Sequence, residues 1–589
     1  MSQIKNRLTS IRDWMSKNNI DALIIPHEDE YLSEYIPPEC ERLEWATGFS
    51  GSAGAAVILK NKAAIFVDGR YTVQVRNQVD ESLLEYKHLV SEPYLKWIQE
   101  NTKNGNKVGY DARLHRASWV KSAKKMLGQN LELVSITENP IDFYWQEKPQ
   151  PKCEQALLLN QKYTGKSSTD KRNEIASKLT SENIDAAFLT QLDSIAWLLN
   201  IRGTDVPCNP VLLCHAIIYK DASLDLFINL EKIPNGFENH VGKGVNAIAS
   251  NKIENQISNL NGKRILYDYT GSNAYCAELL TKAGAKIING ADPCVLPKAC
   301  KNDVELEGMK ACHVRDAVAE CEFLAWFDEQ VNKGNMLDEA TLANKLDGLR
   351  SQQDMYKGLS FGTISAAADN AAMCHYSHLN QDVPGNLKMN SVYLVDSGGQ
   401  YLDGTTDITR TIAVGNPSEH IKKMFTLVLK GHISLGSARF PNGIGGQHVD
   451  TLARQFLWHH GYDFDHGTGH GVGCFLNVHE GPHRIGKGSN NVPLLPGMVV
   501  SNEPGYYEDN KFGIRCENLI FVKESIKAGL YEFENLTFVP FDTRLIDKRL
   551  MTAIELKWLN KYHKQVFEKI SPLVSGDTLI WLKSATQPV

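Results

Sequence analysis

The sequence lacks the features that mark membrane, secreted and nucleic-acid-binding proteins. No uncharged stretch is long enough to span a bilayer, and the first residues include Arg7, Arg12 and Asp13 where a secretion signal has an apolar core. The formal net charge of the 589 residues is -6, and no run of lysine or arginine offers a surface for phosphates. We therefore expect a cytoplasmic protein without nucleic-acid or membrane partners.

Cysteine motifs are missing as well. The 12 cysteines show no CxxC spacing, which argues against a thiolate metal site or a redox pair. Several, such as Cys312 and Cys321, lie within an apolar helical pattern, and we expect them to be reduced core residues. The sequon at Asn535 would matter only in a secreted protein and is discounted.

A weak internal repeat organises the first half of the chain. A helical pattern runs into NIDALIIP at residues 19–26 and again into NIDAAFLT at residues 183–190. Each copy continues through a Gly-containing turn into apolar runs that are typical of buried strands. We predict two related α/β domains, residues 1–155 and 156–302, with their boundary at the proline-containing segment EKPQPKC.

A third domain, residues 303–589, is expected to differ from the first two. A long helix should begin at Asp303 and end at Gly334, followed by helices near 418–437 and 448–460. Strands are indicated by SVYLVDSGG, TTDITRTIAV, MVVSNEPGYYED and FGIRCENLIFV, and Asp403-Gly404 predicts a tight reversal. This pattern predicts an α+β domain of antiparallel strands flanked by helices.

Four acidic residues of this domain lie in or beside apolar strands. Asp396 ends VYLVD, Asp407 lies in a Thr-rich strand, Glu503 follows MVVSN, and Glu517 precedes NLIFV. Most acidic residues are solvated surface groups, and one buried carboxylate could form a salt bridge. Four such groups would carry a heavy desolvation cost unless cations bind them. His470, in the loop HGTGHGVG, supplies a fifth candidate ligand.

This ligand set indicates a reaction class. Four carboxylates and one imidazole suit Mn, Fe(II), Co or Zn with open coordination positions. Two such ions, on the order of 3.5 to 4 Å apart, convert a bridging water into hydroxide at neutral pH. We therefore predict hydrolysis, but ligand types alone do not distinguish a peptide bond from a phosphate ester.

Two further motifs are misleading. HEGPH, residues 479–483, has the letters of HExxH, but its Gly and Pro would disrupt the helix that a zinc protease requires. The loop GTGHGVG lacks both the GxGxxG register and the lysine of a P-loop, so we do not expect it to bind nucleotide phosphates.

The motifs together resemble a known family. DSGGQYLDGTTDITRT, HGTGHGVG, VHEGP, NEPGYYE and GIRCEN are similar to the creatinase/methionine aminopeptidase ("pita-bread") fold, and within it to the Xaa-Pro aminopeptidases, or aminopeptidase P. The spacings agree, with 11 residues from Asp396 to Asp407 and 14 from Glu503 to Glu517. The resemblance implies two creatinase-like α/β domains before a pita-bread catalytic domain with a C-terminal extension, the long three-domain cytosolic type.

The same resemblance implies a role for each ligand. Asp396 would hold one metal, and Asp407 with Glu517 would bridge the pair. His470 and Glu503 would complete the other site, and Glu503 would also receive the proton of the attacking water. Mn²⁺ is the ion we predict for both positions, with Co²⁺ and Zn²⁺ as alternatives.

Other residues match family positions that face the substrate. His375 in MCHYSH would interact with the substrate beside the metals, and His466 and His479 would contact the peptide and stabilise the tetrahedral intermediate. Arg515 would support substrate binding. We assign a structural role to the remaining candidates, which are His378, His459, His460, His483 and Arg70. The stretch HYSHLNQDVPGNLKMN is richer in polar residues than the family's HYAPxP, which leaves the shape of the substrate entrance open.

The leading hypothesis is an exopeptidase that removes the residue before a proline at position two of a peptide. A prolidase, which cleaves Xaa-Pro dipeptides, shares every metal ligand and is the main alternative. Methionine aminopeptidase needs no comparable N-terminal half, and the complete ligand set disfavours a metal-free creatinase or a non-catalytic interaction module. In the resembling family the N-terminal domains shape the entrance of the site and help to build a homodimer, which we expect here too.

Overall fold

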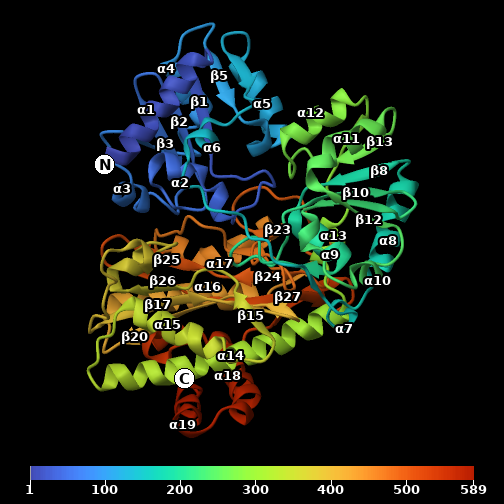
Figure 1. Cartoon of the computed structure of the whole chain (residues 1–589). Coiled ribbons are helices and arrows are strands. Elements are labelled where there is room, and N and C mark those ends of the chain that lie inside the picture. The colour runs from blue at the N-terminus through green and yellow to red at the C-terminus, as the bar shows by residue number, and fades with distance from the viewer. Residues whose placement is uncertain (1) are drawn as a thin grey trace. The chain divides into compact units, whose positions relative to one another are not determined.

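The computed structural model describes residues 2–589, which divide into two compact units (Figure 1). The first contains the chain up to residue 159 together with residues 166–295. The second contains residues 160–165 and 296–589. No helix in the described part of the chain is long and apolar enough to cross a bilayer.

The first unit contains two six-stranded sheets of the same topology. The strands of the first sheet lie in the order β4-β3-β2-β1-β5-β6, and those of the second in the order β12-β11-β10-β8-β13-β14. In both sheets the second and third of the five pairings are antiparallel and the other three are parallel. The first sheet comprises β1 (Ala22–Pro26), β2 (Ala55–Leu59), β3 (Ala63–Val67), β4 (Glu85–His88), β5 (Lys107–Tyr110) and β6 (Glu132–Ser135). The second comprises β8 (Ala186–Leu189), β10 (His215–Tyr219), β11 (Leu224–Ile228), β12 (Val245–Ala249), β13 (Arg264–Tyr267) and β14 (Lys286–Asn289).

This shared topology confirms the sequence repeat, since β1 and β8 are the strands that NIDALIIP and NIDAAFLT predict. Helices cover both faces of the first sheet, which explains why its strands β1, β2 and β3 are apolar throughout. Leu23 and Ile25 face the core that helix α1 (Ser2–Lys17) helps to form, whereas Ile24 faces the core that contains Ile98 of helix α4 (Tyr94–Asn101). Helices α8 (Ser168–Ser181) and α12 (Ala274–Lys282) belong to the second copy.

The second unit opens with the predicted long helix, α14 (Asp303–Asn332). The Asn302 side chain accepts hydrogen bonds from the first free N–H groups of the helix and completes a capping box with Glu305. Gly334, with φ of 80°, follows the last turn and allows the left-handed conformation there. Cys312 and Cys321 are buried on this helix as free thiols, as predicted.

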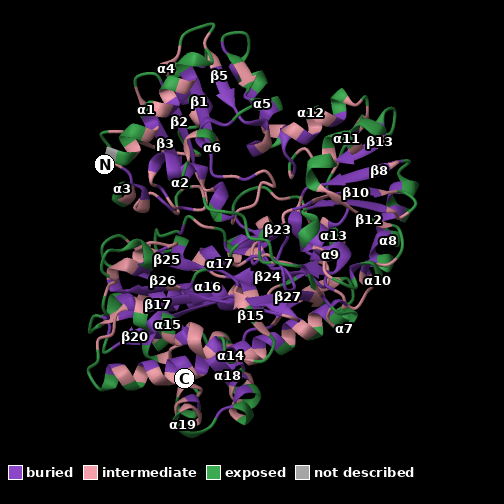
Figure 2. Cartoon of the chain, viewed as in Figure 1, coloured by how far each residue is buried: buried purple, intermediate pink, exposed green. Residues whose placement is uncertain are grey.

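Antiparallel strands and helices build the rest of this unit, as the α+β prediction requires. One sheet has the order β16-β17-β20, and a larger one has the order β21-β28-β27-β24-β22-β23. Most of their strands are buried (Figure 2). The strands are β16 (Ile364–Ala367), β17 (Ser391–Ser397), β20 (Ile408–Val414), β21 (Arg439–Pro441), β22 (Gly469–Gly471), β23 (Glu480–Ile485), β24 (Val499–Asn502), β27 (Asn518–Glu524) and β28 (Leu530–Asn535). Smaller pairings join β15 (Tyr356–Leu359), β18 (Gly399–Tyr401) and β19 (Gly404–Thr405), and β25 (Gly505–Glu508) with β26 (Phe512–Arg515).

Helices close the core of this unit. Besides α14, the predicted helices are α16 (Glu419–Gly436) and α17 (Gly446–Trp458). Three further helices of this unit are α15 (Glu339–Arg350), α18 (Ala553–Ile570) and α19 (Gly576–Ala585). Residues of α14, α16 and α18 share one apolar core with β17 and β20. The reversal predicted at Asp403-Gly404 joins β18 to β19. HEGPH forms no helix, because all of it after His479 belongs to strand β23.

Candidate metal centre

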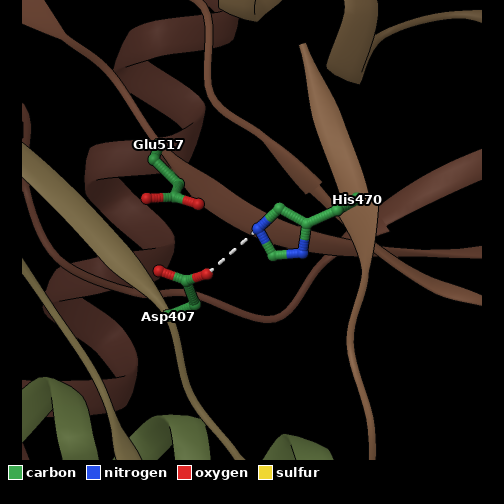
Figure 3. Close-up of side chains that lie close together, drawn as sticks. All are labelled: Asp407, His470 and Glu517. Carbon is green, nitrogen blue, oxygen red and sulfur yellow. Dashed lines mark ion pairs between the residues drawn. The ribbon is translucent and has the colours of Figure 1, made fainter. Parts of the chain in front are cut away.

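The five predicted metal ligands lie in strands of the second unit or directly beside them. Asp396 lies in β17, Asp407 directly precedes β20, and His470 is the middle residue of β22. Glu503 follows β24, and Glu517 stands between β26 and β27. Figure 3 shows the side chains of three of them, from distant parts of the chain, pointing toward one another.

Strand register explains why these carboxylates meet. In the smaller sheet, Asp396 lies opposite Thr409, two residues beyond Asp407. In the larger sheet, Asn502 of β24 lies opposite Asn518 of the antiparallel strand β27. Glu503 follows Asn502 and Glu517 precedes Asn518, so both glutamates lie at the same end of this strand pair. The Glu517 N–H donates to the Thr409 carbonyl oxygen at 3.2 Å and joins the two sheets at this point.

The ligand atoms form a tight cluster. One atom each of Asp407, His470 and Glu517 lies within 4.8 Å of the others. His470 Nε2 is 3.4 Å from Asp407 Oδ2 and 3.5 Å from Glu503 Oε1. On the other side of the ring, Nδ1 is 3.0 Å from the Gly471 carbonyl oxygen, so Nδ1 donates there and Nε2 faces the carboxylates. Metal-binding histidines are commonly oriented by such a second hydrogen bond.

Burial and neighbouring charges shift the pKa values of several of these ligands. Burial raises the pKa of Asp396 to about 6 against the attraction of Arg515, and burial together with Asp407 raises the pKa of Glu517 well above its usual range. Burial also raises the pKa of Glu503. Burial would lower the pKa of His470, but Asp407 and Glu503 outweigh it and raise the pKa to about 9. These raised pKa values favour the protonated forms, and a divalent cation that binds here would displace the protons.

The buried oxygens of Asp396 test whether a cation fits this cluster. Its Oδ2 accepts a hydrogen bond from Arg515 Nη2 at 2.5 Å, but its buried Oδ1 has no hydrogen-bond partner among residues 2–589. An unpaired buried carboxylate oxygen is costly, and a bound cation would satisfy it. The donor set of carboxylate oxygens and one imidazole nitrogen thus fits a divalent ion.

Two hydroxyl groups that the sequence analysis did not single out connect the site. Thr409 Oγ1 donates to Glu517 Oε2 at 2.7 Å and accepts from Arg515 Nε at 3.0 Å. Tyr507 Oη is 2.7 Å from Arg515 Nη1 and 2.9 Å from His466 Nε2. Thr409 lies two residues after Asp407, and Tyr507 lies four residues after Glu503. Both belong to the motifs that contain the ligands, and this nearness in the sequence could have identified them.

The predicted substrate-facing residues gather around the same cluster. The ring of His479 is 4.3 Å from that of His470 and nearly perpendicular to it. His466 reaches the site through its contact with Tyr507. His375 follows Cys374, whose carbonyl oxygen is 3.5 Å from Arg515 Nη1. All three histidines are partly exposed, as contact with a substrate requires.

Three of the residues assigned a structural role have contacts that the structure shows. His483 is buried, with Nε2 2.7 Å from the Val499 carbonyl oxygen. His460 follows the end of α17, and its Nδ1 is 3.0 Å from the Phe456 carbonyl oxygen. Arg70 pairs with Asp68 inside the first unit. Glu480 of the misleading HEGPH motif is buried between Lys298 and Lys301 and forms ion pairs with both.

Comparisons with known proteins match every part of the chain. The model of metallopeptidase family M24 matches residues 307–524, and the model of its C-terminal region matches residues 529–589. Creatinase/prolidase N-terminal domains match residues 7–142 and 147–305. The catalytic domain therefore has the predicted pita-bread fold, preceded by creatinase-like domains.

Individual relatives agree along their whole length. The probable Xaa-Pro aminopeptidase P of Aspergillus flavus is 40% identical over 610 residues, covering 99% of this chain and 92% of that protein. The one from Tuber melanosporum is 40% identical over 618 residues, covering 99% of both. The crystal structure of X-prolyl aminopeptidase from Caenorhabditis elegans, a cytosolic enzyme with a di-nuclear active site, has a TM-score of 0.95 at 34% identity over both whole chains.

A dipeptidase shares the fold over a smaller part of the chain. The Xaa-Pro dipeptidase from Bacillus anthracis has a TM-score of 0.51 at 23% identity, and covers 64% of this chain although 99% of its own. The aminopeptidase relatives, by contrast, span both N-terminal domains and the C-terminal extension. The chain belongs to the Xaa-Pro aminopeptidase P family of the M24 metallopeptidases.

Proposed function

We propose that this enzyme removes the N-terminal residue from peptides that have proline in the second position, with two divalent ions at the cluster described above. The convergence of four buried or half-buried carboxylates and one imidazole on one point carries this proposal. The di-nuclear site of the Caenorhabditis elegans relative supports two ions. Mn²⁺ is the ion we propose, with Co²⁺ and Zn²⁺ as alternatives.

The ligands divide between the two ions. Asp396 would hold one ion, His470 and Glu503 would hold the other, and Asp407 and Glu517 would hold both. The position of Asp407 supports a bridging role, since its carboxylate is near both His470 and Glu517. When bound, such ions lower the pKa of a shared water and polarise the scissile carbonyl.

Glu503 and the surrounding histidines supply the remaining chemistry. The pKa of Glu503 is raised mainly by burial, which suits a carboxylate that takes the proton of the attacking water and returns it to the leaving amine. His375, His466 and His479 bind the peptide, and His466 and His479 stabilise the oxyanion. A single donor of this kind contributes about 2.7 to 4 kcal/mol to catalysis in other hydrolases.

Arg515 organises the side of the site around Asp396. Its guanidinium binds Asp396, and it also contacts the Thr409 and Tyr507 hydroxyls. Tyr507 also contacts His466. Arg515 and Tyr507 therefore connect the proposed metal ligand Asp396 to the proposed substrate-binding residue His466. Arg515 thus supports substrate binding by holding these groups rather than by being exposed, since it is itself buried.

Replacing Tyr507 by phenylalanine should lower kcat/KM about tenfold, the effect of losing one hydrogen bond to a charged group. The loss would come from His466, which would no longer be fixed against Arg515, and the metal content should not change. Steady-state kinetics with metal analysis check this. Tyr506→Phe is the matched control, because its hydroxyl lies 3.4 Å from Glu508, outside the site. Equal losses in both variants would contradict the proposed chain of contacts.

Architecture favours an aminopeptidase over a prolidase. Both N-terminal domains and the C-terminal extension match aminopeptidase P relatives, whereas the dipeptidase fold covers 64% of the chain. We expect the enzyme to release arginine from Arg-Pro-Pro and to leave Arg-Ala-Pro intact, which chromatography of the products measures. Cleavage of an Xaa-Pro dipeptide alone would show that the chain is a prolidase.

We propose further that the domains comprise residues 1–155, 156–302 and 303–589, that the enzyme forms a homodimer, and that it acts in the cytoplasm. The two sheets of the first unit support separate N-terminal domains, although they lie in one compact unit. The cytosolic relative supports the location. Sedimentation equilibrium would test the dimer, since a monomeric mass at micromolar concentration would exclude it.

A further inference from the structure

The segment that carries His375 has an unusual attachment. We call residues 367–385, which run from the last residue of β16 toward β17, the His375 segment. Its outer part is not held by apolar packing, because Leu379 and Val383 are 79% and 80% exposed. It overlaps the polar stretch HYSHLNQDVPGNLKMN, which leaves the shape of the substrate entrance open. Contacts elsewhere must therefore hold His375 in place.

Those contacts meet at one buried carboxylate. Glu339 is the first residue of α15 and is fully buried. Its Oε1 accepts hydrogen bonds from the Ala367 N–H at 2.7 Å and from Asn370 Nδ2 at 2.8 Å. Its Oε2 accepts from the Tyr376 hydroxyl at 2.6 Å and from the Gly385 N–H at 2.8 Å. Both ends of the segment and two of its inner residues thus bind a single side chain.

This arrangement specifies a carboxylate. All four donors are neutral, and no lysine or arginine forms an ion pair with Glu339 in the described chain. A charged acceptor makes each hydrogen bond stronger than a neutral one would. The Glu339 N–H returns a bond to the Gly385 carbonyl at 2.9 Å, and a Cβ at Gly385 would crowd Asn370 and the carboxylate. The closure of the segment on Glu339 leaves no room for a larger residue there.

The opposite side of His375 is fixed to the metal centre. Cys374, the preceding residue, has its carbonyl oxygen 3.5 Å from Nη1 of Arg515, the residue that binds Asp396. The segment also approaches β26 closely, because a Cβ on Gly513 would overlap the Ala371 carbonyl. His375 therefore lies between two anchored neighbours, Cys374 at the metal centre and Tyr376 at Glu339.

We propose that Glu339 is a positioning residue for peptide hydrolysis. Its carboxylate does not touch the substrate. It holds Tyr376 and the two ends of the His375 segment, and thereby holds His375 where it meets the peptide. This inference rests on the proposed role of His375 in substrate binding.

Glu339→Gln tests the inference with little change of shape. The carboxamide keeps one acceptor oxygen, but its NH₂ group must face two of the donors, so one edge of the segment loses its attachment. We expect kcat/KM to fall about 10- to 100-fold, the range for residues that orient a functional group through hydrogen bonds. Metal content should stay at that of the parent enzyme. Glu329→Gln is the control, because Glu329 forms only an exposed ion pair with Lys333.

A double-mutant cycle distinguishes positioning from general stability. If Glu339 acts through His375, adding Glu339→Gln to His375→Ala should lower kcat/KM by less than about twofold further. Multiplicative losses, or full activity of Glu339→Gln, would overturn the positioning role alone. Full activity of His375→Ala would overturn the role of His375 in the proposed function, and the inference with it. Tyr376→Phe, which removes one of the four donors, provides the same cycle if Glu339→Gln does not fold.

Discussion

Replacing Asp407 by asparagine should reduce hydrolysis of Arg-Pro-Pro by about three orders of magnitude or more, which corresponds to about 4 kcal/mol of transition-state stabilisation. Asp407 is the proposed bridge, and its carboxylate lies 3.4 Å from His470 Nε2 and beside Glu517. Asparagine has the same shape but is neutral and offers one oxygen, so it cannot bind both ions as the carboxylate does. Measurements of kcat/KM and of metal content after dialysis check both consequences.

The matched control for this substitution is Asp577→Asn, which makes the same chemical change at an exposed position of α19. Its activity and metal content should equal those of the parent enzyme. Unchanged peptide hydrolysis in Asp407→Asn would refute the two-metal mechanism, whatever the control shows.

Removing the divalent ions should abolish activity, and rebinding them should release protons. The pKa of about 9 at His470 means that this residue is protonated at pH 7 when no cation is bound. The raised pKa of Glu517 also favours its protonated form. Metal ligands must lose their protons before an ion binds. For each proton that is displaced, the apparent affinity of the protein for the ion falls about tenfold when the pH falls by one unit. Titration calorimetry in two buffers that differ in ionisation enthalpy measures the number of protons released. A value of zero at pH 7 would contradict the proposed ligand set.

The same shifts predict how stability depends on pH. His470 has a folded pKa of about 9, above its usual 6.5, so its contribution is present below pH 6.5 and is lost as the pH rises through 9. Asp396, raised from 3.8 to about 6, loses its contribution as the pH rises through 6. The cation-free protein should therefore lose stability in two pH ranges, from 3.8 to about 6 through Asp396 and from 6.5 to about 9 through His470. Mn²⁺ should raise its Tm more at pH 9 than at pH 6. Asp407→Asn should show a much smaller Mn²⁺ effect, and a Tm difference that shrinks with pH would exclude this linkage.

Local sequence patterns predicted most elements of the fold. The repeat led to two sheets of equal topology because the apolar runs around NIDALIIP and NIDAAFLT each form a central strand. The apolar helical pattern and Gly334 located α14, and Gly481-Pro482 correctly excluded a helix at HEGPH. α17 begins at Gly446, two residues earlier than predicted, and no side chain caps its first turn.

Contacts across distant segments were not predictable in the same way. The apolar residues around Asp396 and Glu517 identified both as candidate metal ligands. That their side chains lie in one cluster depends on the strand register in two sheets. Arg515 binds Asp396 across 119 residues, and Tyr376 binds Glu339 across 37. A single sequence shows that such polar residues lie near strand or helix ends, but not which partner each one meets.

Anomalous diffraction from crystals of the Mn²⁺-loaded enzyme would test the central claim most directly. The proposed centre predicts two Mn peaks, about 3.5 to 4 Å apart, in each chain. Both peaks should lie against the carboxylates of Asp407 and Glu517, one of them also against Asp396 and the other against His470 and Glu503. A single peak, or a pair of peaks that Asp407 does not bridge, would contradict the account.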